Sequence, residues 1–335
     1  MGLISSVSDF FRVHWLLLSF CAPMLWAIVN IIDVYFVKEV YDDEMDGTIM
    51  SGLFQIIPWF VLIFFLPWGN FKVLWTNFYG YSIIPNFLMV YALFGGFLFV
   101  SSFYFYFKAL FKHADTALVQ IIWSLTVVIV PAISFFIGAE QLPMIKYIGM
   151  GVVLLGAILL SLSNKIRNKF SVRYMSIMLA AVFLLSLSMI FEGEAYTRIL
   201  DYNFGDQGFL FIFALFSLGA FLAGVFFTIL VKRNPIILIK KYWKVFFVAE
   251  GISFVGTLAS QRSIDVAPSV SYVATVETFV PVFIIFFSLI ILVYLSKIAK
   301  VGNGVIEAIY REQLDGVWIK IIATVVMGVG VYLIS

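Results

Sequence analysis

Long apolar runs, separated by short clusters of charged, Gly, Pro, Asn or Asp residues, follow one another along the whole chain. A helix needs about 20 consecutive apolar residues to cross a bilayer. The pattern predicts ten transmembrane helices, over residues 14–37, 48–67, 86–110, 115–137, 143–163, 174–198, 208–231, 244–262, 266–295 and 316–335. A transmembrane β-barrel would instead show short segments of alternating polarity.

The composition agrees with this pattern, because 63% of the 335 residues are hydrophobic and only 12% are charged. Soluble domains are nearer half apolar and a quarter charged. We therefore expect an all-α integral membrane protein, multi-pass, in the cell (inner) membrane. The single cysteine, Cys21, excludes an intramolecular disulfide, and with two histidines no zinc site is expected. Neither a cofactor nor nucleic acid is expected as a partner.

The chain contains an internal repeat. A shift of 150 residues places "KHADTALVQIIWSLTVVIVPAISFF" over "RSIDVAPSVSYVATVETFVPVFIIF" and aligns Pro131 with Pro281. The tripeptide "EQL" occurs at 140–142 and again at 312–314, each time before a Gly-containing apolar run. Self-similarity at a fixed offset indicates a repeated structural unit.

The repeat divides the chain into two five-helix units. We assign them to residues 1–163 and 174–335, joined by a basic linker at 164–173, with an insertion in the second unit at about 296–311. Because five is an odd number, consecutive copies must enter the membrane from opposite sides. Inverted repeats of this kind are common in secondary transporters, whose substrate sites lie near the bilayer midplane.

Several of these features resemble one known family. They are the ten spans divided five and five, Leu25-Trp26 in the first span, the prolines of spans four and nine, and "EQL" before spans five and ten. Together they look like the EamA-like branch of the drug/metabolite transporter superfamily, over nearly the whole chain. The insertion and the acidic loop "KEVYDDEMDG" depart from that pattern. The resemblance implies a small-molecule transporter. We expect that it is not an enzyme and that it acts in the lipid bilayer as a monomer or homodimer.

The orientation in the membrane has two conflicting indications. The side that holds both termini carries only five of the 21 basic residues, Arg12, Lys72, Lys146, Arg198 and Arg262. The positive-inside rule therefore places both termini outside. Members of the resembled family usually keep both termini in the cytoplasm.

Ionisable residues within predicted spans are the first candidates for function, since each costs a few kcal/mol at a helix centre. They are Asp33, Glu192, Glu194, Glu250 and Glu277. Glu277 is the deepest, and Pro281 leaves the carbonyl of residue 277 without its helical donor. Freed carbonyls beside broken helices help to hold cations in transporters. The other interpretation is a Glu277 that is protonated or hydrogen-bonded across a helix interface.

Polar side chains form stripes at helical spacing in two spans. Span one has Ser19, Pro23, Trp26, Asn30 and Asp33, and span four has Thr116, Gln120, Ser124, Val127, Pro131 and Ser134. Glu277 lies on the corresponding stripe of span nine, and Trp123 and Tyr272 lie on or beside the stripes. The stripes predict a shared cavity, and together with what the family resemblance implies they predict that spans one, three, four, six, eight and nine line it. Polar packing between helices in lipid is the alternative.

Carboxylates beside aromatic faces favour a cation, through charge and cation–π attraction. We therefore expect a secondary transporter that moves a small cationic or zwitterionic metabolite by alternating access. Glu277, supported by Glu250, would bind the substrate or a coupling proton. The side chains expected to shape the site are Trp26, Asn30, Gln120, Trp123 and Tyr272. A proton-coupled exporter of neutral or aromatic metabolites is the second hypothesis.

An enzyme is the more distant alternative. Residues 42–46, "DDEMD", fit the DDxxD pattern with which membrane prenyltransferases chelate Mg²⁺, and Asp42, Asp43 and Asp46 would be the ligands. Such enzymes use two facing acidic motifs, whereas the other acidic loop, "DYNFGD", has the wrong spacing. A solvated acidic loop is the simpler interpretation.

Overall fold

The computed structural model describes residues 15–65, 84–113, 122–138, 140–162, 172–202, 207–294 and 317–335. Every regular element within these ranges is helical, which confirms the all-α prediction. The α-helices are α2 (Trp15–Glu39), α3 (Glu44–Phe54), α4 (Ile56–Phe65), α6 (Ile84–His113), α8 (Thr126–Phe136), α9 (Met144–Leu162), α10 (Val172–Ile199), α11 (Gln207–Leu230), α12 (Pro235–Val266), α13 (Val270–Glu277), α14 (Val280–Tyr294) and α16 (Val317–Ile334). The 3-10 helix η1 (Leu200–Tyr202) follows α10.

Each predicted span contains a described helix, although the second and ninth spans consist of two helices each. The eighth is longer than expected, because α12 already begins at Pro235. Asn234 caps it, since the Asn234 side-chain oxygen accepts hydrogen bonds from the backbone N–H groups of Ile236 and Ile237. The insertion at 296–311 and nearly all of the linker at 164–173 lie outside the described residues.

Five helical segments among the described residues are long and apolar enough to cross a membrane, judged by length and composition. They are Trp15–Asp33, Leu88–Phe111, Met175–Ile199, Gly208–Leu230 and Val270–Ile290, the last of which runs through α13 and α14. Three shorter apolar helices accompany them, at Thr126–Phe136, Met144–Leu160 and Trp318–Ile334. These helices fit a multi-pass membrane protein.

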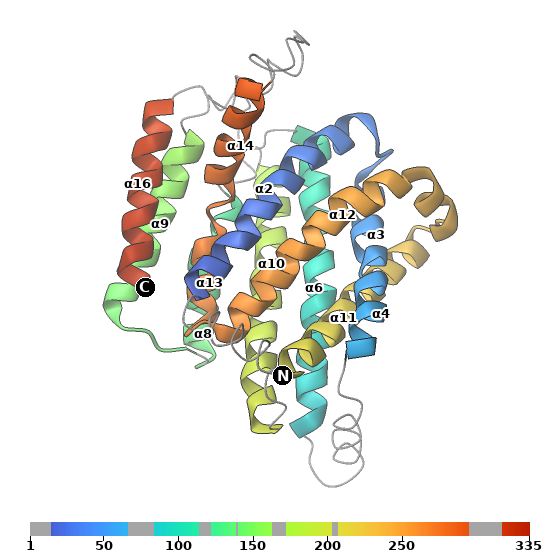
Figure 1. The fold of residues 1–335 in the computed structure, drawn as a ribbon, viewed down its shortest axis with the longest axis horizontal. Coiled ribbons are helices and arrows are strands. Elements are labelled where there is room, and N and C mark those ends of the chain that lie inside the picture. Colours follow the sequence, from blue (N-terminus) through green and yellow to red (C-terminus); the bar gives the residue numbers. More distant parts are fainter. Residues whose placement is uncertain are drawn as a thin grey trace.

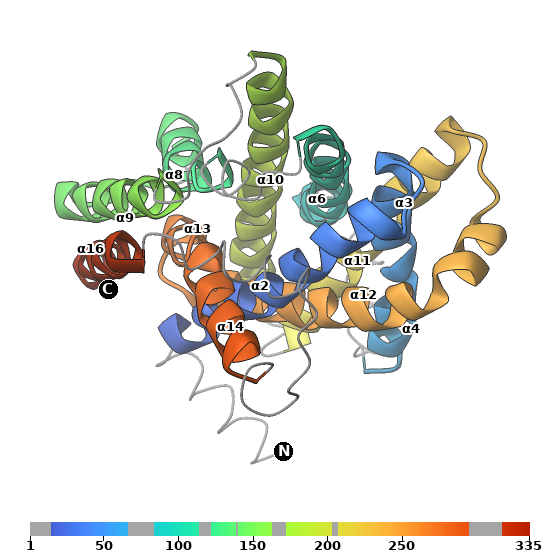
Figure 2. The same ribbon diagram turned by 90° about the horizontal axis from the view of Figure 1, so that it is seen from above.

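The helices pack in pairs that are distant in sequence. α9 and α16 stand side by side at one edge of the molecule (Figure 1). α2 and α12 run alongside each other, and α6 packs against both α10 and α11 (Figures 1 and 2). Because α2 belongs to the first half of the chain and α12 to the second, their contact joins the two halves.

Glycines allow the closest of these contacts. A Cβ added at Gly96 of α6 would lie 1.9 Å from the carbonyl oxygen of Phe216, and one at Gly219 of α11 would lie 1.9 Å from that of Leu93. The backbones of α6 and α11 therefore touch directly, as small residues permit in membrane helix packing.

The two prolines of the predicted repeat lie in different settings. α13 ends at Glu277, the backbone N–H groups of Thr278 and Phe279 bond three residues back, and α14 begins at Val280. Pro281 occupies the first turn of α14, where its missing N–H is tolerated. Pro131, in contrast, lies inside the continuous helix α8.

The first "EQL" tripeptide has a structural role at the start of α13. The carboxylate of Glu140 accepts hydrogen bonds from the backbone N–H of Val270, at 2.8 Å, and from the hydroxyl of Ser271, at 2.5 Å. A negative charge at a helix N-terminus satisfies N–H groups that have no partner within the helix. Glu312, in the second tripeptide, lies outside the described residues.

The glycine contacts predict that replacing glycine by alanine destabilises the protein at some positions and not at others. Gly96→Ala places a methyl group against a backbone carbonyl that cannot rotate away, and overpacking of this kind costs about 1–3 kcal/mol. We expect the melting temperature of the detergent-solubilised protein, followed by tryptophan fluorescence, to fall by several degrees. Gly151→Ala is the control, because among the described residues its added Cβ has no neighbour within 4 Å apart from the backbone of its own helix. Equal melting temperatures for the two variants would contradict the close packing.

Candidate functional site

A cavity of about 70 Å³ lies among helices from both halves of the chain. It exceeds the space that a single water molecule needs. Its walls come from α2, α3, α6, α10, α12 and α14, together with Trp123 before α8. The lining residues are Trp26, Val29, Asn30, Asp33, Ser51, Phe99, Phe103, Tyr106, Phe107, Trp123, Leu185, Glu250, Ser253 and Val280.

Two buried carboxylates face this cavity, Asp33 on α2 and Glu250 on α12. They lie close enough to repel each other when both are ionised. The hydroxyl of Ser51 donates to Oε1 of Glu250 at 2.6 Å. The hydroxyl of Tyr106 donates to Oδ1 of Asn30 at 2.7 Å and lies 3.4 Å from Oδ2 of Asp33.

Neither carboxylate has a basic partner among the described residues. The ion pairs there join Arg198 to Glu194, Arg233 to Asp43 and Asp46, Lys241 to Asp42, and Arg262 to Asp265. Hydroxyl groups alone compensate a buried carboxylate poorly, because its charge loses the solvation of water. Asp33 and Glu250 therefore form a site that a proton or a cationic ligand can complete.

Aromatic rings make most of the remaining wall. Tyr106 contacts Trp123 edge to face, with ring centroids 5.3 Å apart, and Phe99 contacts Phe103 at 4.7 Å. Trp26 packs over Gly256, whose added Cβ would lie 2.8 Å from Nε1 of the indole. The side chains thus form an aromatic enclosure around the two carboxylates, which suits a ligand that is both cationic and partly apolar.

The structure brings five of the sequence-predicted site residues together at this cavity. They are Trp26, Asn30, Asp33, Trp123 and Glu250. The first three belong to the predicted stripe of span one, whereas Ser19 of that stripe is buried elsewhere. Gln120 lies outside the described residues.

Glu277, predicted as the central residue, does not line this cavity. The physical reason is the break after α13. In a continuous helix Glu277 and Val280 would share a face. The turn at Thr278 and Phe279 separates them, and Val280 faces the cavity instead. Glu277 is buried and accepts a hydrogen bond of 2.5 Å from the hydroxyl of Ser260.

Glu277 belongs to a second buried polar group, with Glu192 of α10. The two carboxylates are close enough to interact electrostatically. The hydroxyl of Ser188 lies 2.7 Å from Oε1 of Glu192 and 2.8 Å from the carbonyl oxygen of Gly95. Gln261 lies beside Glu192 and accepts a hydrogen bond of 2.8 Å from Tyr196. Four of the five predicted carboxylates are thus divided between two buried places.

The two other predicted residues, Glu194 and Tyr272, contact side chains away from the cavity. Glu194 is partly exposed and pairs with Arg198 one helical turn later, at 3.2 Å. Tyr272 stacks on Trp15, with ring centroids 6.0 Å apart, and the Nζ atom of Lys146 lies 5.8 Å from its ring centre. Neither residue reaches the cavity.

Three polar lining residues escaped the sequence prediction, namely Ser51, Tyr106 and Ser253. The sequence does contain a pattern that indicates Ser51, because the polar residues Thr48, Ser51 and Gln55 recur at spacings of three and four. All three are buried in the structure. Ser253 lies one turn after Glu250 and could have been found in the same way. Tyr106 is hidden in the aromatic run "FYFYF". Lys320 of α16, also buried, was not singled out either.

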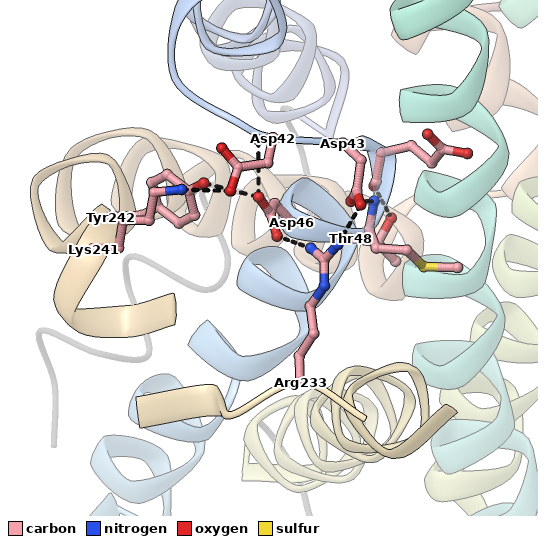
Figure 3. Close-up of polar contacts among 9 residues, drawn as sticks. Asp42, Asp43, Asp46, Thr48, Arg233, Lys241 and Tyr242 are labelled. Carbon is pink, nitrogen blue, oxygen red and sulfur yellow. Dashed lines mark hydrogen bonds and ion pairs between the residues drawn. The ribbon is translucent and has the colours of Figure 1, made fainter. Parts of the chain in front are cut away.

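The acidic loop before α3 is held by basic and phenolic side chains (Figure 3). Asp42 accepts a hydrogen bond of 2.5 Å from Lys241, which lowers the pKa of the Asp42 carboxyl below its ordinary value. Arg233 bonds to both Asp43 and Asp46. Asp46 is buried, and its Oδ2 also accepts from the backbone N–H of Asp42 at 3.0 Å.

Further contacts complete this arrangement. Oδ1 of Asp43 accepts from the backbone N–H of Met45 and so caps α3, and the hydroxyl of Tyr242 donates to Oδ2 of Asp46 at 2.8 Å. Among the described residues no group of three or more His, Cys, Asp or Glu side chains is arranged to hold a metal ion. The oxygens that the magnesium hypothesis requires are therefore bonded to protein donors.

Comparison with known proteins identifies a shared fold. No family model and no curated protein matches this chain. Fifteen chains of known structure match it, among them one described only as "Crystal structure of protein". That chain is 17% identical to this one with a TM-score of 0.52, and the match covers 93% of this chain and 98% of the other. At such low identity the likeness shows a shared fold alone.

Proposed function

We propose that this protein is a secondary transporter of small organic cations, built from ten membrane spans in two inverted five-helix repeats. The observation that carries the proposal is the pair Asp33 and Glu250, buried in an aromatic cavity and without a basic partner among the described residues. In a transporter, a buried carboxylate without a counter-charge from the protein can bind a cation and release it again.

The helix contacts support the inverted repeat. If each span of the first half corresponds to the span five places later, α2 corresponds to α10 and α6 to α12. The contact of α2 with α12 then corresponds to that of α10 with α6, and both are extensive. The contacts of α13 and α14 with α2 likewise correspond to that of α8 with α10. The pairs α3 with α11 and α9 with α16 map onto themselves. A two-fold axis in the membrane plane produces this exchange.

The lining favours a simple cation over a zwitterion. Two carboxylates and the faces of Trp26 and Trp123 attract an ammonium group, whereas the lining residues include neither Lys nor Arg to receive a substrate carboxylate. The described cavity is small, so binding a metabolite requires the walls to move. Movement of the two repeats relative to each other, as in alternating access, would provide this space.

The second buried group, Glu192 with Glu277, has a different role in this proposal. Both carboxylates are surrounded by hydroxyl and amide groups, outside the cavity. Two neighbouring carboxylates without a cation do not both ionise readily, so one of them retains a proton. We assign this group to proton coupling. A protein that moves neutral aromatic compounds in exchange for protons would use the same group, while its cargo would not require Asp33 and Glu250.

The cargo assignment predicts charge-dependent binding. Purified protein should bind phenethylammonium, measured by calorimetry, and Glu250→Gln or Asp33→Asn should weaken the Kd by on the order of 10- to 100-fold, because a cation then loses one of its two counter-charges. Glu194→Gln is the control, since Glu194 pairs with Arg198 away from the cavity. Binding of neutral phenethyl alcohol as tight as that of the ammonium compound, or Kd values unchanged in both cavity variants, would contradict the assignment.

The coupling assignment predicts a separable effect of Glu277. In proteoliposomes, Glu277→Gln should leave phenethylammonium binding within a few-fold of the original protein and flatten the dependence of its uptake on pH. The reason is that an amide cannot exchange a proton in this range. The Glu194→Gln variant should keep the original pH profile. An unchanged profile in Glu277→Gln would show that Glu277 has no part in coupling.

A further inference from the structure

The turn between α11 and α12 and the first part of α12 together form a short segment that we call the arm. We define the arm as residues 231–241, which follow the end of α11 and include the first seven residues of α12. At Tyr242 the backbone of α12 leaves the helical region, with φ −113° and ψ 19°, so the helix is kinked there. Figure 2 shows α12 bending toward this end. Hinges are made from a few residues that absorb such changes in φ and ψ.

The arm is bonded at several points to the loop between α2 and α3 and to the first turn of α3 (Figure 3). Arg233 bonds to Asp43 and Asp46, and Lys241 bonds to Asp42. These ion pairs form a network whose members differ in solvent exposure. The Asp46 side chain is only 1% exposed, while that of Asp42 is 70% exposed. An exposed pair contributes little on its own, whereas a buried carboxylate that loses its partner costs several kcal/mol. The Arg233–Asp46 pair is therefore the strongest fastening.

Aromatic side chains connect this network to the cavity. The ring of Tyr242 contacts that of Tyr41, with centroids 5.3 Å apart, and Tyr41 contacts Phe107 at 6.0 Å. Phe107 is itself part of the cavity wall. Burial raises the pKa of Tyr41 well above its ordinary value, and the nearby carboxylates of Glu250 and Asp33 add to the effect. Tyr41 thus fills the space between the cavity and the ion pairs.

We propose that the arm, hinged at Tyr242, is a gate that closes one entrance of the cavity, and that the ion pairs of Asp42, Asp43 and Asp46 hold it shut. When these bonds break, the arm and Tyr242 move away together. Tyr41 and Phe107 then lose their cover, and the cavity opens to the side of the membrane on which the α2–α3 loop lies.

The position of Glu250 gives the gate a connection to the ligand. Glu250 follows Tyr242 by eight residues on the same helix, about 12 Å at the rise of an α-helix. Asp33 precedes the loop at the end of α2 in a similar way. Both cavity carboxylates are therefore on α2 and α12, the helices that lead into the network, and a ligand that draws them together favours the closed arrangement.

Thiol accessibility tests the gate without any assumption about the cargo. Val29 lines the cavity, and Cys21 is the only native cysteine. In a Cys21→Ser background, Val29→Cys is labelled in membrane vesicles with an impermeant methanethiosulfonate applied from each side in turn. Adding Arg233→Gln should raise the labelling rate from the side of the loop on the order of tenfold, because the population of the open state rises. The rate from the other side should not rise.

Arg198→Gln is the matched control, since it removes an ion pair on α10 that has no part in the network. An unchanged labelling rate with Arg233→Gln, or an equal rise with Arg198→Gln, would overturn the gate. The proposal rests on the proposed function only in taking the cavity as the substrate site. If the ammonium compound does not bind but labelling rises as expected, the gate is retained and the cargo assignment fails.

A second pair of variants tests the gate even if the Arg233→Gln variant does not fold. Lys241→Glu sets two negative charges against each other at the exposed end of the network, where folding tolerates substitution, and should also raise the labelling rate. Combining it with Asp42→Lys restores opposite charges and should return the rate toward that of the original protein. A rate that stays low in Lys241→Glu and in Arg233→Gln, or one that the charge exchange does not lower, would count against the gate.

Discussion

The cost of burying a carboxylate is the constraint on which the interpretation of this molecule depends. An ionised carboxylate inside an apolar protein needs a counter-charge, a proton or several hydrogen-bond donors. Asp46 and Asp265 meet this need with Arg233 and Arg262. Asp33, Glu250, Glu192 and Glu277 meet hydroxyl and amide groups and no basic side chain among the described residues. The first two carboxylates are neutralised within the protein, and on our proposal the other four are available to a proton or a cation.

The fold places two of these carboxylates, Asp33 and Glu250, on one packed pair of helices. α6 and α11 are in backbone contact through Gly96 and Gly219, so this pair has little freedom to slide. α2 and α12 also pack on each other, and together they carry both cavity carboxylates. The same two helices lead into the network of Asp46 and Arg233. In our proposals, binding inside the cavity and closure at its end therefore involve one helix pair.

The sequence predicted the helical architecture because long apolar runs leave few alternatives. Helical spacing also placed Trp26, Asn30 and Asp33 on one face, and they do share the cavity. Glu277 was expected there too, from the repeat alignment and Pro281. That expectation assumed that span nine keeps one face throughout, whereas the turn after Glu277 divides it. A proline indicates where a helix is interrupted and does not indicate how the two parts rotate. The bonds of Asp42 to Lys241 and of Asp46 to Arg233 could not be predicted from the sequence either, because the partners are nearly 200 positions apart.

The most direct measurement is a structure of the protein with a bound organic cation, such as a brominated phenethylammonium whose halogen marks its orientation. The account predicts that the ammonium nitrogen lies between the carboxylates of Asp33 and Glu250, with the ring against Trp26 or Trp123. A cation bound beside Glu277 and Glu192, with the aromatic cavity empty, would contradict it.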